Sequence, residues 1–216
     1  MTRFTTSFAA LFLAITLGAG CALPTARPIS ASSLQQDPDW LYLAAVPAVE
    51  QVSREGCGAA CLAMVLQYWG HEVSPEELER ECVVPGIEGI RAASLRDAAR
   101  RRGLSAYLFA GTVEDVEHEL RRGRPVIVGL AHPRGDAYLS HFQVVVGLHP
   151  SRQDVAVLEP AVGHLMRDAL VDFAVAWGRA RNVMLVVFET ETWIEPRLEA
   201  VEYAFTAPAP PRGSSR

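Results

Sequence analysis

The chain has 216 residues, of which half are hydrophobic and 21% are charged, and its formal net charge is −5. This length is enough for one domain with a sizeable hydrophobic core and too short for two large domains. A mildly acidic chain without a long basic run offers no electrostatic basis for binding nucleic acid, which depends on contacts between basic side chains and phosphate. The densest basic cluster, Arg96–Arg102, is interrupted by Asp97 and is interpreted as the solvated end of a helix.

The N-terminus has the composition of an export signal. Arg3 gives a positive start, residues 8–17 form an apolar run too short to span a bilayer, and small residues at 18–20 lead into Cys21. This pattern resembles a bacterial lipoprotein signal, which implies that residues 1–20 are removed and that Cys21 is lipidated. The protein would then be exported and anchored to a membrane through Cys21, facing the periplasm or the cell exterior. Ordinary signal cleavage near Ala22, which would release the protein, is the alternative.

The segments on either side of the predicted domain differ from it in composition. Residues 22–38 are rich in Pro, Ser, Ala and Gln without periodicity, and they predict a tether over residues 21–46. Within that stretch, Trp40–Ala45 is a candidate edge strand. We expect a folded domain over residues 47–189 and a C-terminal extension over residues 190–216, which ends in a disordered tail rich in Pro and Ala.

The first half of the domain is predicted to be mostly helical. Apolar residues recur at three- and four-residue steps from Ala60 to Tyr68, which indicates a buried helix that begins at Cys57 and ends near Gly70. Ser74 and Pro75 are typical of the start of a second helix. The remaining predicted elements of this half are a helix over 93–102, a strand over 105–109, and a helix that follows Thr112 and ends before Gly123.

The second half is predicted to be mostly strand. Apolar runs over 125–131, 141–148, 154–158 and 183–188 predict four strands, and an amphipathic pattern over 167–177 predicts a helix. Most connections are too short for crossover helices, so we expect antiparallel neighbours. The sequence therefore predicts an α+β fold, with N-terminal helices packed on a twisted antiparallel sheet.

Cys57 is the candidate nucleophile. It lies in the predicted first turn of a buried helix, where free backbone N–H groups and the positive end of the helix dipole stabilise a thiolate. The alternative is a small buried thiol without chemistry. Cys61 lies one turn further along the apolar stripe and is predicted to serve in packing.

An imidazole and a carboxylate are predicted to meet beside this thiol. His141 begins one predicted strand, and Glu159 ends the next, directly before Pro160. If these strands form a hairpin, antiparallel geometry returns Glu159 to the side of His141. Either residue could instead be an exposed polar group at the edge of the sheet. The other histidines, at positions 71, 118, 132, 149 and 164, are predicted to lie at the surface.

Gln51, which precedes Cys57 by six residues, could donate its side-chain amide to an oxyanion or could be a solvated polar residue. The segment from Gln51 through Cys57-Gly-Ala-Ala-Cys-Leu-Ala-Met, followed by His141-Phe-Gln-Val-Val-Val-Gly and Glu159-Pro160, resembles the bacteriocin-processing, double-glycine leader peptidases. These are papain-like cysteine peptidases, and the resemblance covers residues 48–188. It implies that Cys57 is the nucleophile, His141 the general base, Glu159 the orienting acid and Gln51 the oxyanion donor, with a peptide or protein as substrate.

The chain departs from the family pattern at three points. Glu159 stands where the family has Asp, no phosphate-binding loop or fused ATP-driven exporter is present in this chain, and an export signal precedes the domain. These departures leave three alternatives to a peptidase open. They are an inactive papain-like domain that binds peptides, an acyl-transferase with the same thioester chemistry, and a structural lipoprotein that scaffolds a partner.

The remaining cysteine, Cys82, ends the second predicted helix. In an oxidising compartment it could form a disulfide with Cys61, or both could be packed, reduced thiols, which we favour. No two pairs of cysteines have the spacing of a zinc site, so neither a metal nor a cofactor is predicted.

Overall fold

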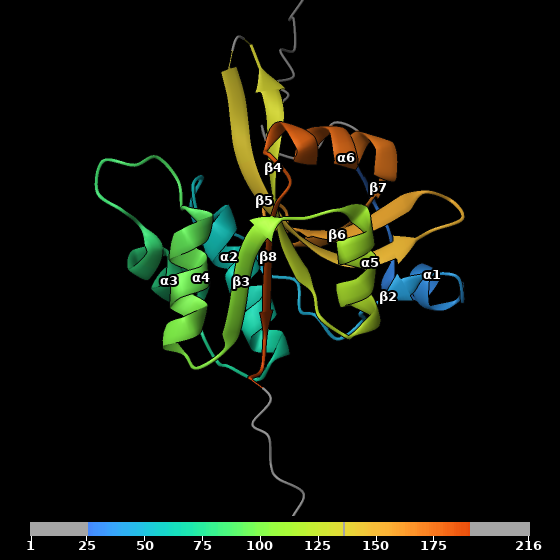
Figure 1. Ribbon diagram of the computed structural model, residues 1–216, viewed down its shortest axis with the longest axis horizontal. Helices are drawn as coiled ribbons and strands as arrows, with labels where there is room; N and C mark the ends of the chain where they lie inside the picture. The colour runs from blue at the N-terminus through green and yellow to red at the C-terminus, as the bar shows by residue number, and fades with distance from the viewer. Residues whose placement is uncertain (1–25, 136, 191–216) are drawn as a thin grey trace, which may run out of the picture.

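The computed structural model describes residues 26–135 and 137–190 (Figure 1). The predicted signal peptide, the lipidation site at Cys21 and residues 191–216 of the predicted C-terminal extension lie outside the described residues. Among the helices of the described part, none is both long enough and apolar enough to cross a bilayer.

An antiparallel sheet is the centre of the fold. Its strands follow the order β1-β7-β6-β5-β4-β8-β3, and β2 pairs with β5 outside this path. The strands are β1 (Arg27–Pro28), β2 (Leu41–Tyr42), β3 (Ser105–Ala110), β4 (Val126–Arg134), β5 (Ala137–His149), β6 (Asp154–Glu159), β7 (His164–Ala169) and β8 (Val183–Phe188). The predicted α+β fold with antiparallel neighbours is confirmed.

Helices cover both sides of this sheet (Figure 1). They are α1 (Ala31–Gln35), α2 (Cys57–Tyr68), α3 (Pro75–Cys82), α4 (Ala92–Arg101), α5 (Val113–Arg121) and α6 (Leu170–Arg179). One apolar cluster joins α2, α3 and α4 to one face of the sheet, and a second joins α5 and α6 to the other face. The sheet thus separates two hydrophobic cores within one domain.

The helix ends follow the signals in the sequence. The hydroxyl of Ser74 accepts the backbone N–H of Glu77 at the start of α3, and Thr112 forms a reciprocal capping box with Asp115 at the start of α5. Beyond α2, Gly70 adopts a positive φ of 82°, which allows the N–H of His71 to return to the carbonyl of Leu66. This hydrogen bond closes the C-terminal end of α2. Every residue of this helix from 58 to 66 is buried.

The predicted tether over residues 21–46 does not hold for the part that the structure describes. β1 pairs with β7, β2 pairs with β5, and Leu34 of α1 is only 1% exposed within the first core. Backbone pairing of short strands needs no apolar periodicity, so a composition rich in Pro and Ser concealed it. The described residues that precede residue 47 are therefore part of the packed domain.

Two strands also differ from the prediction. β5 begins at Ala137, four residues before the predicted start at His141, because β4 and β5 continue as a hairpin that projects beyond the body of the sheet (Figure 1). Exposed side chains on this extension conceal it in the hydrophobic pattern. β7 was not predicted, and the helix expected over 167–177 begins at Leu170, since residues 164–169 pair with β6.

Candidate active site

Cys57 is the first residue of α2, as predicted. The first hydrogen bond of the helix runs from Ala60 N–H to the Gly56 carbonyl, so the N–H groups of residues 57–59 have no partner within the helix. Gly56 has no side chain to cap them. The entry loop is held by Ser53, whose hydroxyl donates to Glu79 of α3 at 2.5 Å. A half-buried thiol therefore lies at the uncapped, electropositive end of a buried helix.

His141 connects this thiol to a carboxylate. Its Nε2 donates to Oε1 of Glu159 at 2.7 Å, and its ring lines the same cleft as Cys57, whose side chain interacts with it. Since Nε2 is committed to Glu159, Nδ1 is the nitrogen left to exchange a proton with the thiol. Burial alone would lower the pKa of His141, but the hydrogen bonds to Cys57 and Glu159 and their charges raise that pKa from 6.5 to about 10.

The hairpin geometry brings Glu159 to this position. β5 and β6 pair in antiparallel register, Val144 opposite Leu158, so Glu159 returns to the level of residue 143 and lies beside His141. The carboxylate is 1% exposed and has three donors. Oε1 accepts from His141 and from the backbone N–H of Ala161 at 2.8 Å, and Oε2 accepts from Nε2 of Gln143 at 2.6 Å. The juxtaposition of His141 and Glu159 expected from the sequence is present.

Gln143 was missed by the sequence-based reasoning. It is fully buried in β5, two residues after His141, and alternate residues of a strand share a face. The available signal was its polarity, because it is the one polar side chain in the run from Phe142 to Leu148. A buried amide in such a run requires a hydrogen-bond partner, and here the partner is Glu159.

The side-chain amide of Gln51 is bound within its own loop. Its side-chain Nε2 donates to the backbone carbonyls of Ser53 at 2.8 Å and Arg54 at 3.2 Å, within the loop that leads to Cys57. Its own backbone N–H donates to the carbonyl of Pro160 at 2.8 Å, which ties this loop to the residue after Glu159. The predicted oxyanion donor is thus close to the site in the chain, but its amide is engaged elsewhere.

A cleft of about 220 Å³ gives access to the thiol. It lies between the loop before α2, residues 88–90 of the α3–α4 loop, and residues 138–142 of β5. Gly58 follows Cys57 in α2, and a Cβ at this position would come within 3.2 Å of both Leu95 and Phe142. The first turn of α2 therefore packs closely against β5, which keeps Cys57 next to His141.

The other two cysteines of the described residues are buried, free thiols. Cys61 and Cys82 form no disulfide, in agreement with the alternative we favoured. Burial raises the pKa of Cys61 well above its ordinary value, and it raises the pKa of Cys82 to about 11. Cys57 is consequently the one described cysteine that borders the cleft.

Two histidines predicted at the surface lie partly or fully inside. Burial and the nearby charge of His141 lower the pKa of His132, whose Nε2 has no hydrogen-bond partner among the described residues. His149 is buried next to Asp37 and Asp39, which together have the donor types and spacing of a metal site. However, its Nδ1 accepts the N–H of Arg152, which places the ring proton on Nε2 and turns it toward Asp37 at 3.4 Å. The guanidinium of Arg152 pairs with Asp37, so the charge of this carboxylate is balanced by an ion pair rather than by a metal.

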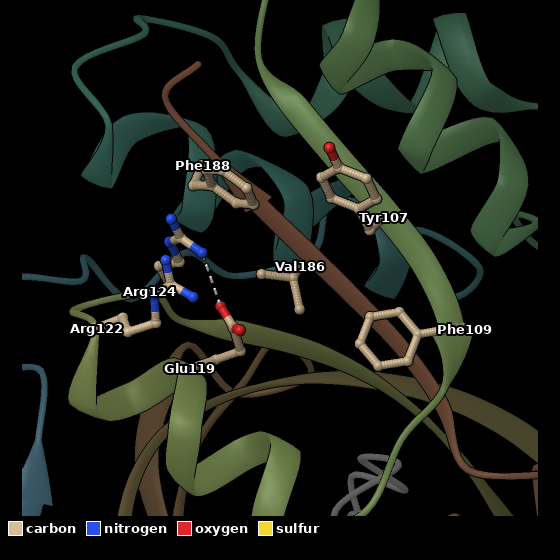
Figure 2. Close-up of a pocket in the computed structure, with 7 residues that line it drawn as sticks. All are labelled: Tyr107, Phe109, Glu119, Arg122, Arg124, Val186 and Phe188. Carbon is tan, nitrogen blue, oxygen red and sulfur yellow. Dashed lines mark hydrogen bonds and ion pairs between the residues drawn. The ribbon is translucent and has the colours of Figure 1, made fainter. Parts of the chain in front are cut away.

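A second hollow, of about 420 Å³, lies away from the thiol (Figure 2). Tyr107 and Phe109 of β3 and Phe188 of β8 line it, with the guanidinium of Arg124 lying 3.6 Å from the centre of the Phe188 ring. Arg124 also pairs with Glu119 of α5 at 3.3 Å. The side chains shown in Figure 2 include no nucleophile beside a general base, so the cleft at Cys57 is the candidate active site.

Comparisons with known proteins identify the family of the chain. The profile of the Peptidase C39 family matches residues 45–189. No curated protein shows significant sequence similarity to the chain. A C39-like peptidase from Bacillus anthracis has a similar structure, with a TM-score of 0.57 and 18% identity over 70% of this chain and 98% of the other.

Two further structures are similar. The peptidase domain of Streptococcus ComA gives a TM-score of 0.55 and 19% identity over 67% of this chain and 99% of the other. A double glycine motif protease from an AMS/PCAT transporter gives 0.52 and 24% identity over 67% and 92%. At these identities the structures show a shared fold, whereas the profile covers most of the chain. The protein belongs to the Peptidase C39 family and is a cysteine-type peptidase.

Proposed function

We propose that this peptidase hydrolyses peptide bonds through a covalent acyl-enzyme on Cys57, with His141 as general base and acid and Glu159 as the group that orients His141. The observation that carries the proposal is the grouping of three side chains: the half-buried thiol of Cys57 and His141 line one cleft, and the buried Glu159 accepts from His141 at 2.7 Å. A nucleophile, a proton shuttle and an orienting acid in this order are the parts that acyl transfer requires.

The reaction begins with transfer of the Cys57 proton to His141. The sulfur attacks the carbonyl carbon of the scissile bond, and the resulting oxyanion lies near the free N–H groups at the start of α2. His141 then gives its proton to the leaving amine, and a thioester remains on Cys57. Water, deprotonated by His141, attacks the thioester and regenerates the thiol. Glu159 holds the imidazole in place throughout through its hydrogen bond to Nε2.

Gln51 is the proposed side-chain donor to the oxyanion. Its Oε1 is buried without a hydrogen-bond partner among the described residues, so the amide is held on one side only. Donation to an oxyanion requires Nε2 to release the carbonyls of Ser53 and Arg54 when substrate enters. A Gln51→Ala variant is expected to lose about a hundredfold in turnover, the usual effect of removing one oxyanion donor.

The proposed substrate is a peptide or an extended segment of a protein, and the proposed location is outside the cytoplasm. The first point is supported by the AMS/PCAT relative, whose structure contains a leader peptide. The second is supported by the apolar N-terminal run and the small residues before Cys21, which also favour a lipid anchor on Cys21. Partition of the full chain into detergent, compared with a Cys21→Ser variant, tests the anchor, and equal partition of both would contradict it.

The activity is tested by incubating the full chain with a mixed peptide library and identifying products by mass spectrometry. Cleavage by the wild type, together with none by Cys57→Ala, is the expected result. A Cys61→Ala variant serves as the matched control, since this thiol is one turn deeper and fully buried. An added amine distinguishes the classes, because an acyl-transferase would give the amide product. Peptide binding without cleavage would overturn hydrolysis.

A further inference from the structure

The buried amide of Gln143 is unusual in its surroundings. Its side chain is 0% exposed within β5, and its register partner on β4 is Val128. Its Oε1 has no hydrogen-bond partner among the described residues. A buried acceptor left unpaired destabilises a fold, and an apolar side chain would avoid this cost. A reason for the amide must therefore come from the one contact that it does make.

That contact is with the carboxylate that orients His141. Nε2 of Gln143 donates to Oε2 of Glu159 at 2.6 Å, whereas His141 and the Ala161 N–H both donate to Oε1. His141 and Gln143 are alternate residues on one face of β5, so their Cα atoms are about 7 Å apart. The carboxylate bridges these two donors, and each of its oxygens faces a different one.

Glu159 needs such a second donor because of its length. A glutamate has one more rotatable bond than an aspartate, and ordering this bond costs conformational entropy. If Oε2 were free, the carboxylate could turn about this bond and withdraw Oε1 from His141. The backbone N–H of Ala161 donates to the same oxygen as His141. Without Gln143, this N–H would therefore leave Oε2 without a donor.

We propose that Gln143 is a positioning residue, which fixes the carboxylate of Glu159 so that Oε1 faces Nε2 of His141. It touches neither the thiol nor the cleft, and it acts through Glu159 alone. This inference rests on the proposed roles of His141 and Glu159.

The test substitutes Gln143→Met, which keeps length and removes the donor. Two quantities are measured on the full chain: the pKa of His141 by NMR, and the rate at which iodoacetamide alkylates Cys57 near neutral pH. We expect the pKa of His141 to fall by about one unit and the alkylation rate to fall by about tenfold, since one pKa unit corresponds to a factor of ten. The melting temperature should be unchanged or higher, because the substitution also removes the unpaired Oε1.

Gln67→Met is the matched control. Gln67 also donates its side-chain amide to one acceptor, the carbonyl of Val73 at 2.9 Å, but it lies at the far end of α2 from Cys57. Gln67→Met should leave both the pKa of His141 and the alkylation rate of Cys57 unchanged. Equal losses in the two variants would mean that Gln143 has only a structural role.

A double-mutant cycle with Glu159→Gln makes the test sharper. If Gln143 acts through the charge of Glu159, Gln143→Met has no further effect on His141 once that charge is gone. The inference is overturned if Gln143→Met lowers the pKa of His141 equally in the wild type and in Glu159→Gln, or if it does not lower this pKa in the wild type. Glu159→Asp should also lower the pKa of His141, since a shorter side chain draws the carboxylate back from both donors. These readouts need no peptide substrate, so absence of cleavage would refute the proposed hydrolysis and leave this inference testable.

Discussion

Replacement of Glu159 by Gln is the perturbation whose consequence is most sharply defined by the structure. The substitution retains the size of the side chain and removes a negative charge whose oxygen lies 2.7 Å from Nε2 of His141. Both residues are buried, at 1% and 3% exposure, so water screens their interaction only weakly. The loss must therefore appear in the protonation of His141.

The expected size of the effect follows from the position of the charge. Cys57 and Glu159 together raise the pKa of His141 to about 10 against the opposing effect of burial. One opposite charge at this distance shifts a pKa by about 1–3 units, which corresponds to about 1.4–4 kcal/mol. In Glu159→Gln we therefore expect the pKa of His141 to fall by about 1–3 units.

The sign of the stability change is fixed by the same shift. A pKa that is higher in the folded than in the unfolded protein stabilises the fold below the unfolded value and loses this effect as pH rises through the folded value. For His141 these limits are 6.5 and about 10. The loss in the free energy of unfolding of Glu159→Gln, relative to the wild type, should therefore be largest near pH 6.5 and should diminish as the pH approaches about 10.

The assay is an NMR titration of the six labelled histidines, with His141 assigned by substitution. Glu189→Gln is the matched control, because it removes a carboxylate 3.1 Å from His71 in an exposed pair. Glu189→Gln should leave the pKa of His141 unchanged, because this pair is exposed and does not involve His141. A wild-type His141 that titrates near 6.5, or one that Glu159→Gln does not shift downward, would refute the reasoning.

Three further predictions concern the packing of the domain. Leu34→Ala should lower the free energy of unfolding in urea by about 2–5 kcal/mol, whereas substitution of the exposed residue in Ser32→Ala should leave it unchanged. A Leu34→Ala variant as stable as the wild type would mean that α1 does not pack against the core. Gly58→Ala forces a Cβ against Phe142, so it should lower stability by about 1–3 kcal/mol and slow alkylation of Cys57; an unchanged rate would contradict this close packing. Dialysis against a chelator should leave the melting temperature unchanged, because an ion pair balances charge in the cluster around His149; a lower melting temperature would indicate a bound metal.

The part of the site that the sequence predicted depends on local rules. A glycine-preceded apolar helix placed Cys57 at an uncapped start, and a hairpin between two apolar strands returned Glu159 to His141. Each inference needed only the period of one element or the pairing of two neighbours in the chain. Such features are encoded over short distances and can therefore be predicted without a structure.

The parts that could not be predicted depend on three-dimensional packing. The role of Gln143 follows from which face of β5 meets β6, and the predicted strand began at His141 because the exposed extension from Ala137 has no apolar alternation. The conformation of Gln51 is decided by carbonyls of its own loop. Residues 27–28 and 41–42 join the sheet through backbone pairing, which the amino-acid composition does not reveal.

The central claim is that Cys57 is activated by His141, and alkylation by iodoacetamide with peptide mapping tests it most directly. With the full chain near neutral pH, the account predicts one label per chain among the three cysteines that the structure describes, at Cys57, and a large loss of that label in His141→Ala. Cys61 and Cys82 should react only after unfolding, since both are buried. Labelling that shows no preference for Cys57, or that is as fast in His141→Ala as in the wild type, would contradict the account.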